Sequence, residues 1–517
     1  MHPSLHARPV ALFAVLTVGG GLFVVSADAA TANVALSAIS RDGKSGPISG
    51  SAINLSSGKI YALDTGSPAP LPTGKYAVGA YINEYPALIV AARTVSISKS
   101  TTLTFDSRKA AKVSFNVGDP SVHPVALAVV PFASIGGKDR AFVTASSVSW
   151  PAATTYVLPD PAPGLRLGIH GVLASSTEPA PVRYDLAYSL PGMPSKVAFT
   201  TSKAKLARVD LNVGTIDEEQ SSRLALTAKL KNLRPVTGVA VDIPVLGKQT
   251  SYRTPGLQWG STLTMNDLDA SAFLEEKQKA KKLLYAAGKT YREDWGLGIW
   301  GPRPTTPAFY TQNGKLTVAG GPGICAFSGT GVTLTACQLQ PQTFMYTLAR
   351  GKTPLGKGTG ISVAGATTPQ WYTATMTGSR NGTGDRASQV SAKWYFQAGG
   401  RYRKETATHI FTGENPVLPG YFRIVAAGAD ERNRVAAGSK TTLGLSVLKF
   451  GKVASMTLKY STDGGKTWKV AKVTHKGAAW TAAVPAPASG LVSLKATAKN
   501  AIGGTSELTV LDAYGVR

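Results

Sequence analysis

Alternation of apolar and polar residues with a period of two runs through almost the whole chain, and it constrains the fold more than any other feature. Val34, Leu36 and Ala38 alternate with small or polar residues, and the pattern returns around residues 76–82, 103–105 and 113–117. Successive side chains of a β-strand point to opposite faces, so this period predicts strands with one face in a core and the other in water. Turn sequences such as Arg41-Asp42-Gly43 and Asp463-Gly464-Gly465 separate the runs. The sequence therefore predicts an all-β chain of several antiparallel β-sandwich domains in series.

One stretch departs from this pattern. Residues 271–287 (SAFLEEKQKAKKLLYAA) are rich in Glu, Lys, Leu and Ala, and Gly288 follows as a plausible stop. The apolar positions do not form a clean stripe. We expect at most one short, exposed helix there.

The first 29 residues have the features of a secretory signal peptide. Arg8 is followed by an apolar run over residues 10–25 and by the small-x-small pattern Ala27-Asp28-Ala29. A membrane anchor is the weaker alternative, because the run is shorter than the ~20 residues of a bilayer span and glycines interrupt it. The sequence predicts a signal peptide at 1–29, secretion to the outside of the cell and no transmembrane anchor.

The length of 517 residues corresponds to three or four domains after the signal, at about 150 residues each. Polar and proline-containing stretches suggest the boundaries. The predicted ranges are 30–115 (β-sandwich), 116–215 (β-sandwich), 216–423 (β-rich, with both cysteines and the possible helix) and 424–517 (Ig-like).

Two cysteines, Cys325 and Cys337, lie close together in the sequence. An even number of cysteines in an exported chain favours one disulfide. The near sequence offers no His as a base for a catalytic thiol and no further ligands at zinc spacing. We expect a local disulfide between Cys325 and Cys337.

Several stretches, in their order along the chain, resemble the long non-catalytic region that follows the protease domain in actinobacterial secreted subtilisin-like (S8) serine peptidases. They are residues 41–44 (RDGK), 71–78 (LPTGKYAV), 103–109 (LTFDSRK), 291–295 (YREDW), 390–394 (VSAKW), 460–468 (YSTDGGKTW) and 513–515 (AYG). The first three resemble the family's prealbumin-like (carboxypeptidase-regulatory-like) segment, which implies such a sandwich at 30–115. The protease domain has no counterpart, so the resemblance implies secretion and architecture without proteolysis.

Fragments of a subtilisin triad occur in the right order as Asp64, His170 and Ser506. A triad needs the nucleophile, base and orienting carboxylate within hydrogen-bond reach, and all three residues lie outside the helical contexts of that fold. A glycan-active site is the other enzymatic alternative, with Glu275-Glu276 or Glu293-Asp294 as candidate carboxylates. Adjacent residues on a strand point to opposite faces, which argues against both pairs. We expect no catalytic residues, no metal and no cofactor.

Residues 461–468 (STDGGKTW) fit an Asp-box, a hairpin seen in sialidase-like propellers. A propeller would repeat the motif and this chain has one copy, so we expect a structural hairpin. In it, Asp463 would bond backbone amides, Gly465 would complete the turn and Trp468 would be a packing residue.

Lysines crowd the same region, in a chain with a net charge of +26. The candidate anion-binding residues are Lys459, Lys466, Lys469, Lys472 and Lys476. Such charges attract anionic polymers, and the plain alternative is a solvated face that keeps the protein soluble. We expect a secreted, non-catalytic binding or scaffolding protein whose partner is an anionic envelope polymer, a glycan or a secreted protein, with no specific nucleic acid. An accessory partner of a separately encoded secreted serine peptidase is the second expectation.

Overall fold

The computed structural model describes 17 separate stretches of the chain. These are residues 30–142, 154–175, 182–214, 221–230, 243–244, 247–266, 273–278, 284–302, 309–312, 314–318, 324–325, 332–338, 342–380, 387–399, 415–416, 419–477 and 479–517. The signal peptide predicted at 1–29 lies outside them. Within these stretches, no helix has the length and apolarity needed to cross a bilayer.

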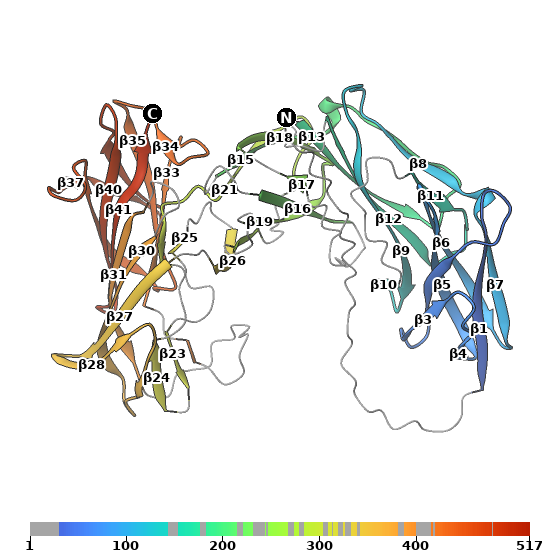
Figure 1. Cartoon of the computed structure of the whole chain (residues 1–517), viewed down its shortest axis with the longest axis horizontal. Helices are drawn as coiled ribbons and strands as arrows, with labels where there is room; N and C mark the ends of the chain where they lie inside the picture. Colours follow the sequence, from blue (N-terminus) through green and yellow to red (C-terminus); the bar gives the residue numbers. More distant parts are fainter. Residues whose placement is uncertain are drawn as a thin grey trace, which may run out of the picture.

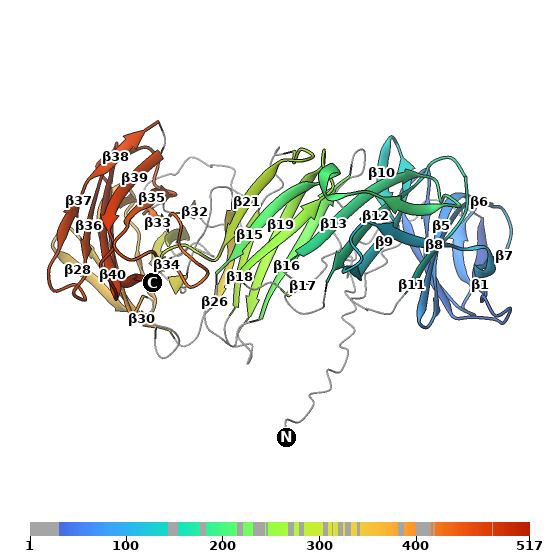
Figure 2. The same ribbon diagram turned by 90° about the horizontal axis from the view of Figure 1, so that it is seen from above.

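The chain is all-β, as the alternating sequence predicts. Helical structure in the described residues consists of two three-residue 3-10 turns, η1 (Ser107–Lys109) and η2 (Lys203–Lys205). Most strand pairs are antiparallel, and parallel pairs such as β1 with β7 and β6 with β11 join segments distant in sequence. Figure 1 shows the sheets following one another from the blue N-terminal strands to the red C-terminal strands, and Figure 2 shows the same order from above.

The N-terminal part is built from a three-stranded and a seven-stranded sheet. The first sheet has the order β4 (Ala69–Pro72), β1 (Thr31–Ile39), β7 (Thr101–Asp106). The second has the order β14 (Val197–Thr200), β8 (Ala111–Asn116), β11 (Thr154–Leu158), β6 (Ala87–Ile97), β5 (Gly74–Glu84), β2 (Ile48–Asn54), β3 (Ile60–Asp64).

The seven-stranded sheet is buried on both faces at its centre. In β5, Tyr76 and Val78 belong to the core beneath the three-stranded sheet, whereas Ala77 packs with Val129 and Leu167 on the opposite side. The expectation that each strand keeps one face in water is therefore wrong for β5. A third layer covers the second face of β5. Period-two patterning does not reveal this layer, because Ala and Gly occur at both buried and exposed positions of a strand.

A second seven-stranded sheet forms that third layer and continues into the middle of the chain. Its order is β10 (Lys138–Ala141), β9 (His123–Ile135), β12 (Leu165–Ala174), β13 (Val182–Pro191), β18 (Gly247–Arg253), β15 (Ala207–Val213), β21 (Thr290–Trp295). A five-stranded sheet follows, with the order β17 (Ile243–Pro244), β16 (Ser221–Lys229), β19 (Gln258–Asn266), β20 (Phe273–Gln278), β26 (Val332–Gln338). Leu224, Leu226 and Trp259 of this sheet share one core with Val209 and Leu211 of β15.

The helix predicted at 271–287 is wrong where the structure describes that stretch. Residues 273–278 form β20, which pairs with β19 on one side and β26 on the other. Tyr285 is buried and accepts a hydrogen bond from the Arg253 guanidinium. Helix propensity is a weak preference of tenths of a kcal/mol per residue, and pairing with two neighbouring strands overrides it.

The C-terminal part is a sandwich of a nine-stranded and a four-stranded sheet. The larger sheet has the order β28 (Thr353–Gly358), β27 (Gln342–Arg350), β30 (Gln370–Arg380), β31 (Gln389–Ala398), β41 (Thr505–Val516), β40 (Leu491–Asn500), β36 (Val453–Ser461), β37 (Lys469–Ala471), with β34 (Arg434–Val435) beside β41. The smaller sheet has the order β33 (Tyr421–Ala426), β35 (Lys440–Leu448), β39 (Ala479–Pro485), β38 (Val473–Lys476).

Two small sheets complete the C-terminal half. One is β29 (Ile361–Ala364), β24 (Lys315–Val318), β23 (Phe309–Gln312), β32 (Asn415–Pro416), and the other is β22 (Gly301–Pro302) with β25 (Ile324–Cys325). Phe309 packs edge-on against Trp394 and Phe396 of β31, which ties the first of them to the sandwich core.

Strands pair across all three predicted internal domain boundaries, and across residue 215 β15 pairs with β18 and β21. β11 and β14, which follow residue 116, extend the sheet that begins in 30–115. β31, which precedes residue 424, pairs with β41 over seven positions. The C-terminal sandwich thus contains strands from both sides of that boundary.

Candidate functional site

The nine-stranded sheet of the C-terminal sandwich has an outer face that carries exposed side chains. The strand β31 alternates strictly: Ala392, Trp394 and Phe396 are buried, whereas Lys393 and Tyr395 point outward. The smaller sheet packs against the inner side only. The outer side chains of β27, β30, β31, β41, β40 and β36 therefore form one continuous face.

Four exposed lysines lie on this outer face, and we call them the lysine face: Lys393 of β31, Lys459 of β36, and Lys495 and Lys499 of β40. The backbone register fixes their spacing. Lys459 is directly opposite Lys495, so their β-carbons lie about 5 Å apart. Lys393 lies two strands away from β40, across β41, a distance of about 10 Å.

The charges of the lysine face are only weakly compensated. Glu507 of β41 stands opposite Lys393, and the other acidic residue of β41, Asp512, accepts a hydrogen bond from the Ser388 hydroxyl. Among the ion pairs of the described residues, none includes Lys393, Lys459, Lys495 or Lys499. Like charges directly opposite one another destabilise a sheet, so an anion above Lys459 and Lys495 would relieve that repulsion.

Hydroxyl groups fill most of the positions between the lysines. The outward threonines and serines on these strands and on β27 and β30 are Thr347, Thr373, Thr375, Thr377, Ser391, Ser455, Thr457, Thr497, Thr505 and Thr509. Thr347 and Thr375 hydrogen-bond to each other through their hydroxyls. Each hydroxyl can both donate and accept, so the face can bond a ligand rich in polar groups.

The five lysines singled out from the sequence do not share one face. Lys459 lies on the outer face, whereas Lys469 of β37 pairs with Tyr460, whose ring packs toward the core. Lys466 lies in the turn after β36, Lys472 between β37 and β38, and Lys476 at the end of β38 in the smaller sheet. All five are exposed and surround one edge of the sandwich, with only Lys459 on the lysine face.

The Asp463 hairpin is held by its own side chains. The backbone amide of Thr467 donates to Asp463 at 2.9 and 3.1 Å, and the amide of Gly465 donates to the Ser461 hydroxyl at 2.9 Å. Hydrogen bonds from Ser461 and Thr467 hold the pKa of Asp463 well below its usual range. Gly465 has a φ of +85° beside the Trp468 ring, a conformation that favours glycine. Trp468 is half-buried, so it packs against the hairpin without entering the core.

Cys325 lies in β25 and Cys337 in β26, and these strands belong to different sheets. Their side chains lie outside the described part of the structure. The disulfide stays a prediction.

A buried ion-pair network lies in the middle sandwich, which the second seven-stranded sheet forms with the five-stranded sheet. Arg253 of β18 contacts Glu293 of β21 through two hydrogen bonds of 2.8 and 2.9 Å, and Arg183 contacts Asp185 within β13. Burial would raise the pKa of Asp185, but the Arg183 guanidinium outweighs it and holds that pKa well below the usual range. Glu293 behaves in the same way, with Arg253 as the opposing charge. Each carboxylate is paired with a guanidinium, so the network is structural in character.

The candidate carboxylate pairs of a glycan-active site are not assembled where the structure shows them. Glu293 is buried in that network, whereas Asp294 points to the other face of β21 and pairs with Arg292 at 2.8 Å. This separation is the one expected for neighbours on a strand. The side chains of Glu275 and Glu276 lie outside the described residues.

The triad fragments belong to three different sheets. Asp64 ends β3, His170 lies in β12 against the edge of Trp259, and Ser506 lies in β41. The Ser506 hydroxyl is buried and donates to the Gly420 carbonyl at 3.0 Å. The structure therefore does not bring a base to this serine.

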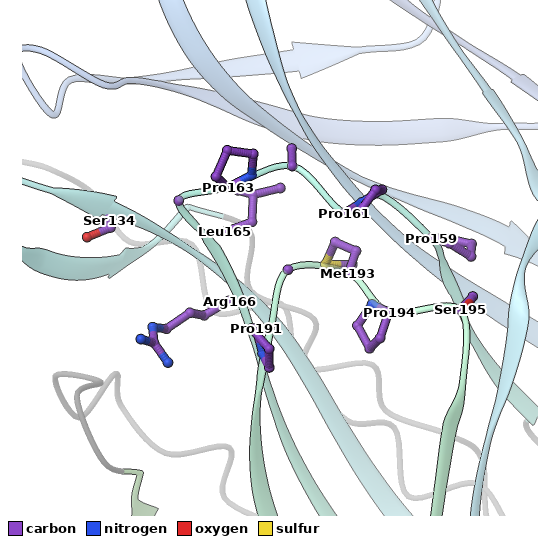
Figure 3. A pocket seen from close by; sticks show the side chains of 13 residues that line it. Ser134, Pro159, Pro161, Pro163, Leu165, Arg166, Pro191, Met193, Pro194 and Ser195 are labelled. Carbon is purple, nitrogen blue, oxygen red and sulfur yellow. The ribbon is translucent and has the colours of Figure 1, made fainter.

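A cavity of about 720 Å³ opens at one end of β12 and β13 (Figure 3). Five prolines and Met193 are among its lining residues, and its polar side chains are Ser134, Ser195 and Arg166. Arg166 is paired with Asp139 at 3.3 Å. Its lining contains no carboxylate, histidine or cysteine, so it offers no acid–base pair for catalysis.

Comparisons with known proteins do not show a family for this chain. No family model matches the chain, and no curated protein matches it. A solved structure of Escherichia coli alpha-2-macroglobulin activated by porcine elastase aligns at 9% identity with a TM-score of 0.14, over 91% of this chain and 50% of that one. This chain thus spans about half the length of that protein, and a likeness at this level carries no argument about fold or function.

Proposed function

We propose that this chain is a secreted, non-catalytic protein that binds anionic polymers outside the cell on its lysine face. The observation that carries the proposal is the register that sets Lys459 opposite Lys495, with Lys499 and Lys393 nearby and no ion pair to any of the four among the described residues. The net charge of +26 draws polyanions toward the molecule from a distance.

The surroundings of the lysines support the same function. The flat hydroxyl-rich face suits an extended partner better than a small substrate, because the polar groups are spread over several strands. The resemblance of the chain to a non-catalytic region of secreted peptidases supports an extracellular binding role. That resemblance also supports a second candidate, an accessory partner of a separately encoded secreted serine peptidase, which would be detected as a change in that peptidase's kcat/KM on addition of this chain.

Binding of fluorescently labelled polyglutamate and polyphosphate to the full chain tests the proposal. A triple variant, Lys459→Gln/Lys495→Gln/Lys499→Gln, should weaken binding at least about tenfold, since it removes the central charges of the face. Affinity should fall as salt rises, because about 0.1 M salt screens charges beyond about 10 Å.

A matched control removes the same number of charges elsewhere. Lys99, Lys109 and Lys112 are exposed lysines of the N-terminal part, and their triple replacement by Gln should change the affinity by no more than about twofold. Equal losses in the two triple variants would mean that net charge alone attracts the polymer. Absence of binding by the wild-type chain at low salt would refute the proposed function.

A further inference from the structure

An aromatic pair lies at the edge of the lysine-bearing part of the same outer face. The rings of Trp371 of β30 and Tyr395 of β31 stack with centroids 4.6 Å apart and planes 13° from parallel. Tyr395 is 36% exposed and Trp371 is partly buried. Aromatic surface is normally withdrawn from water, so a stacked pair left open on a polar sheet face is a candidate contact for a ligand.

The register places this pair beside the lysines. Tyr395 is opposite Thr505 of β41, and Thr505 is opposite Lys499 of β40. Tyr395 and Lys499 are therefore two strands, about 10 Å, apart on one face, with a hydroxyl between them. Gly503, in the turn that joins β40 to β41, lies beside the Trp371 ring, so this turn borders the aromatic pair.

We infer that the ligand of the lysine face is an acidic polysaccharide, an inference that rests on the function proposed above. A bare polyanion would need only the cations. A chain of acidic sugars uses all three features of the face: carboxylates meet the lysines, sugar hydroxyls meet the threonines, and the apolar side of a sugar ring covers the open aromatic surface.

A membrane with anionic headgroups is the competing source of negative charge, and the geometry favours it less. Membrane-binding surfaces place apolar side chains where they can reach beyond the headgroups. Here the two rings stack on each other at the sheet face, and the large exposed apolar side chains near the lysines are Ile502 in the adjoining turn and Val470 opposite Lys459, on different elements.

Two polymers with one carboxylate per repeat distinguish a ligand that needs sugar rings from one that needs only negative charge. They are polygalacturonate, which has sugar rings, and polyglutamate, which has none. Titration of the full chain with each, at equal carboxylate number and equal salt, should give about tenfold tighter binding of polygalacturonate. Trp371→Thr/Tyr395→Thr should abolish this preference while leaving polyglutamate binding within about twofold. Threonine is chosen as the replacement because its strand propensity is high, like that of the threonines already on this face.

The control is Met345→Thr/Val470→Thr, which removes two exposed apolar side chains of the same sheet outside the aromatic pair, Met345 opposite Thr377 and Val470 opposite Lys459, and should preserve the preference. Tyr395→Phe keeps the aromatic ring and should also preserve the preference for polygalacturonate. This variant shows that a change at position 395 does not by itself abolish the preference. Equal wild-type affinity for the two polymers would overturn the inference and leave the proposed function standing. Failure to bind either polymer would remove both, and binding to phosphatidylserine vesicles but not to polygalacturonate would overturn the choice of a glycan.

Discussion

Replacing Arg253 by methionine should destabilise the middle sandwich by about 3–5 kcal/mol, because it leaves the buried Glu293 carboxylate without its cation. The two side chains are 0% and 6% exposed, and two hydrogen bonds of 2.8 and 2.9 Å join the guanidinium to the carboxylate. After the replacement, the Tyr285 hydroxyl is the remaining side-chain hydrogen-bond donor that the structure shows for Glu293.

The double variant Arg253→Met/Glu293→Met should be more stable than the single variant. Replacing a whole buried ion pair by apolar residues of similar volume is often nearly neutral, whereas removing one partner strands a charge. Tyr285 would lose its acceptor, which costs about 1–3 kcal/mol. The coupling between the two sites should therefore amount to at least about 1–2 kcal/mol in a double-mutant cycle.

Amide hydrogen exchange in β18 and β21 measures this effect locally, which matters in a chain with several sandwiches that need not unfold together. The opening free energies of these strands should fall in the single variant and recover partly in the double variant. A single variant within about 1 kcal/mol of the wild type, or a double variant less stable than the single one, would refute this account of the network.

Three further outcomes follow from the structure. The pKa values of Asp185 and Glu293 in the folded state lie below their unfolded values of about 4. The stability that these two carboxylates supply is therefore full above about pH 4 and declines as the pH falls toward the lower folded values. Hydrogen-exchange protection of β13 and β21 should accordingly weaken below about pH 4. Trp468→Ala should cost about 1–2 kcal/mol in calorimetry of the C-terminal sandwich, less than the 3–5 kcal/mol of a fully buried tryptophan, since Trp468 is half-buried; a cost above that would place its ring in the core. Thiol labelling of the folded full chain without reductant should leave Cys325 and Cys337 unmodified, and two labelled cysteines in folded protein would exclude the predicted disulfide.

Period-two patterning is enough to predict the fold class, because it follows directly from strand geometry. Leu494, Lys495 and Ala496, for example, take the buried and exposed positions that their alternation indicates. The pattern failed where tertiary pairing decides: residues 273–278 have helix-favouring composition and yet form an interior strand of a sheet. It failed also for β5, whose second face is covered by strands more than 40 residues away.

The candidate site was only partly accessible from the sequence. Grouping lysines near Trp468 found Lys459 and missed Lys393, Lys495 and Lys499, although each occupies a polar position in an alternating strand. The missing information was the strand order. β31 and β40 are about 100 residues apart in sequence and become near neighbours only because β41 pairs with both. No local pattern encodes that arrangement.

Chemical footprinting of lysines tests the central claim most directly. The full chain is acetylated with and without polygalacturonate, and the modification of each lysine is read by mass spectrometry. We expect that Lys393, Lys459, Lys495 and Lys499 become protected by the polymer, whereas Lys99, Lys109 and Lys112 remain as reactive as before. Uniform protection, or protection concentrated on lysines away from the outer face of the nine-stranded sheet, would contradict it.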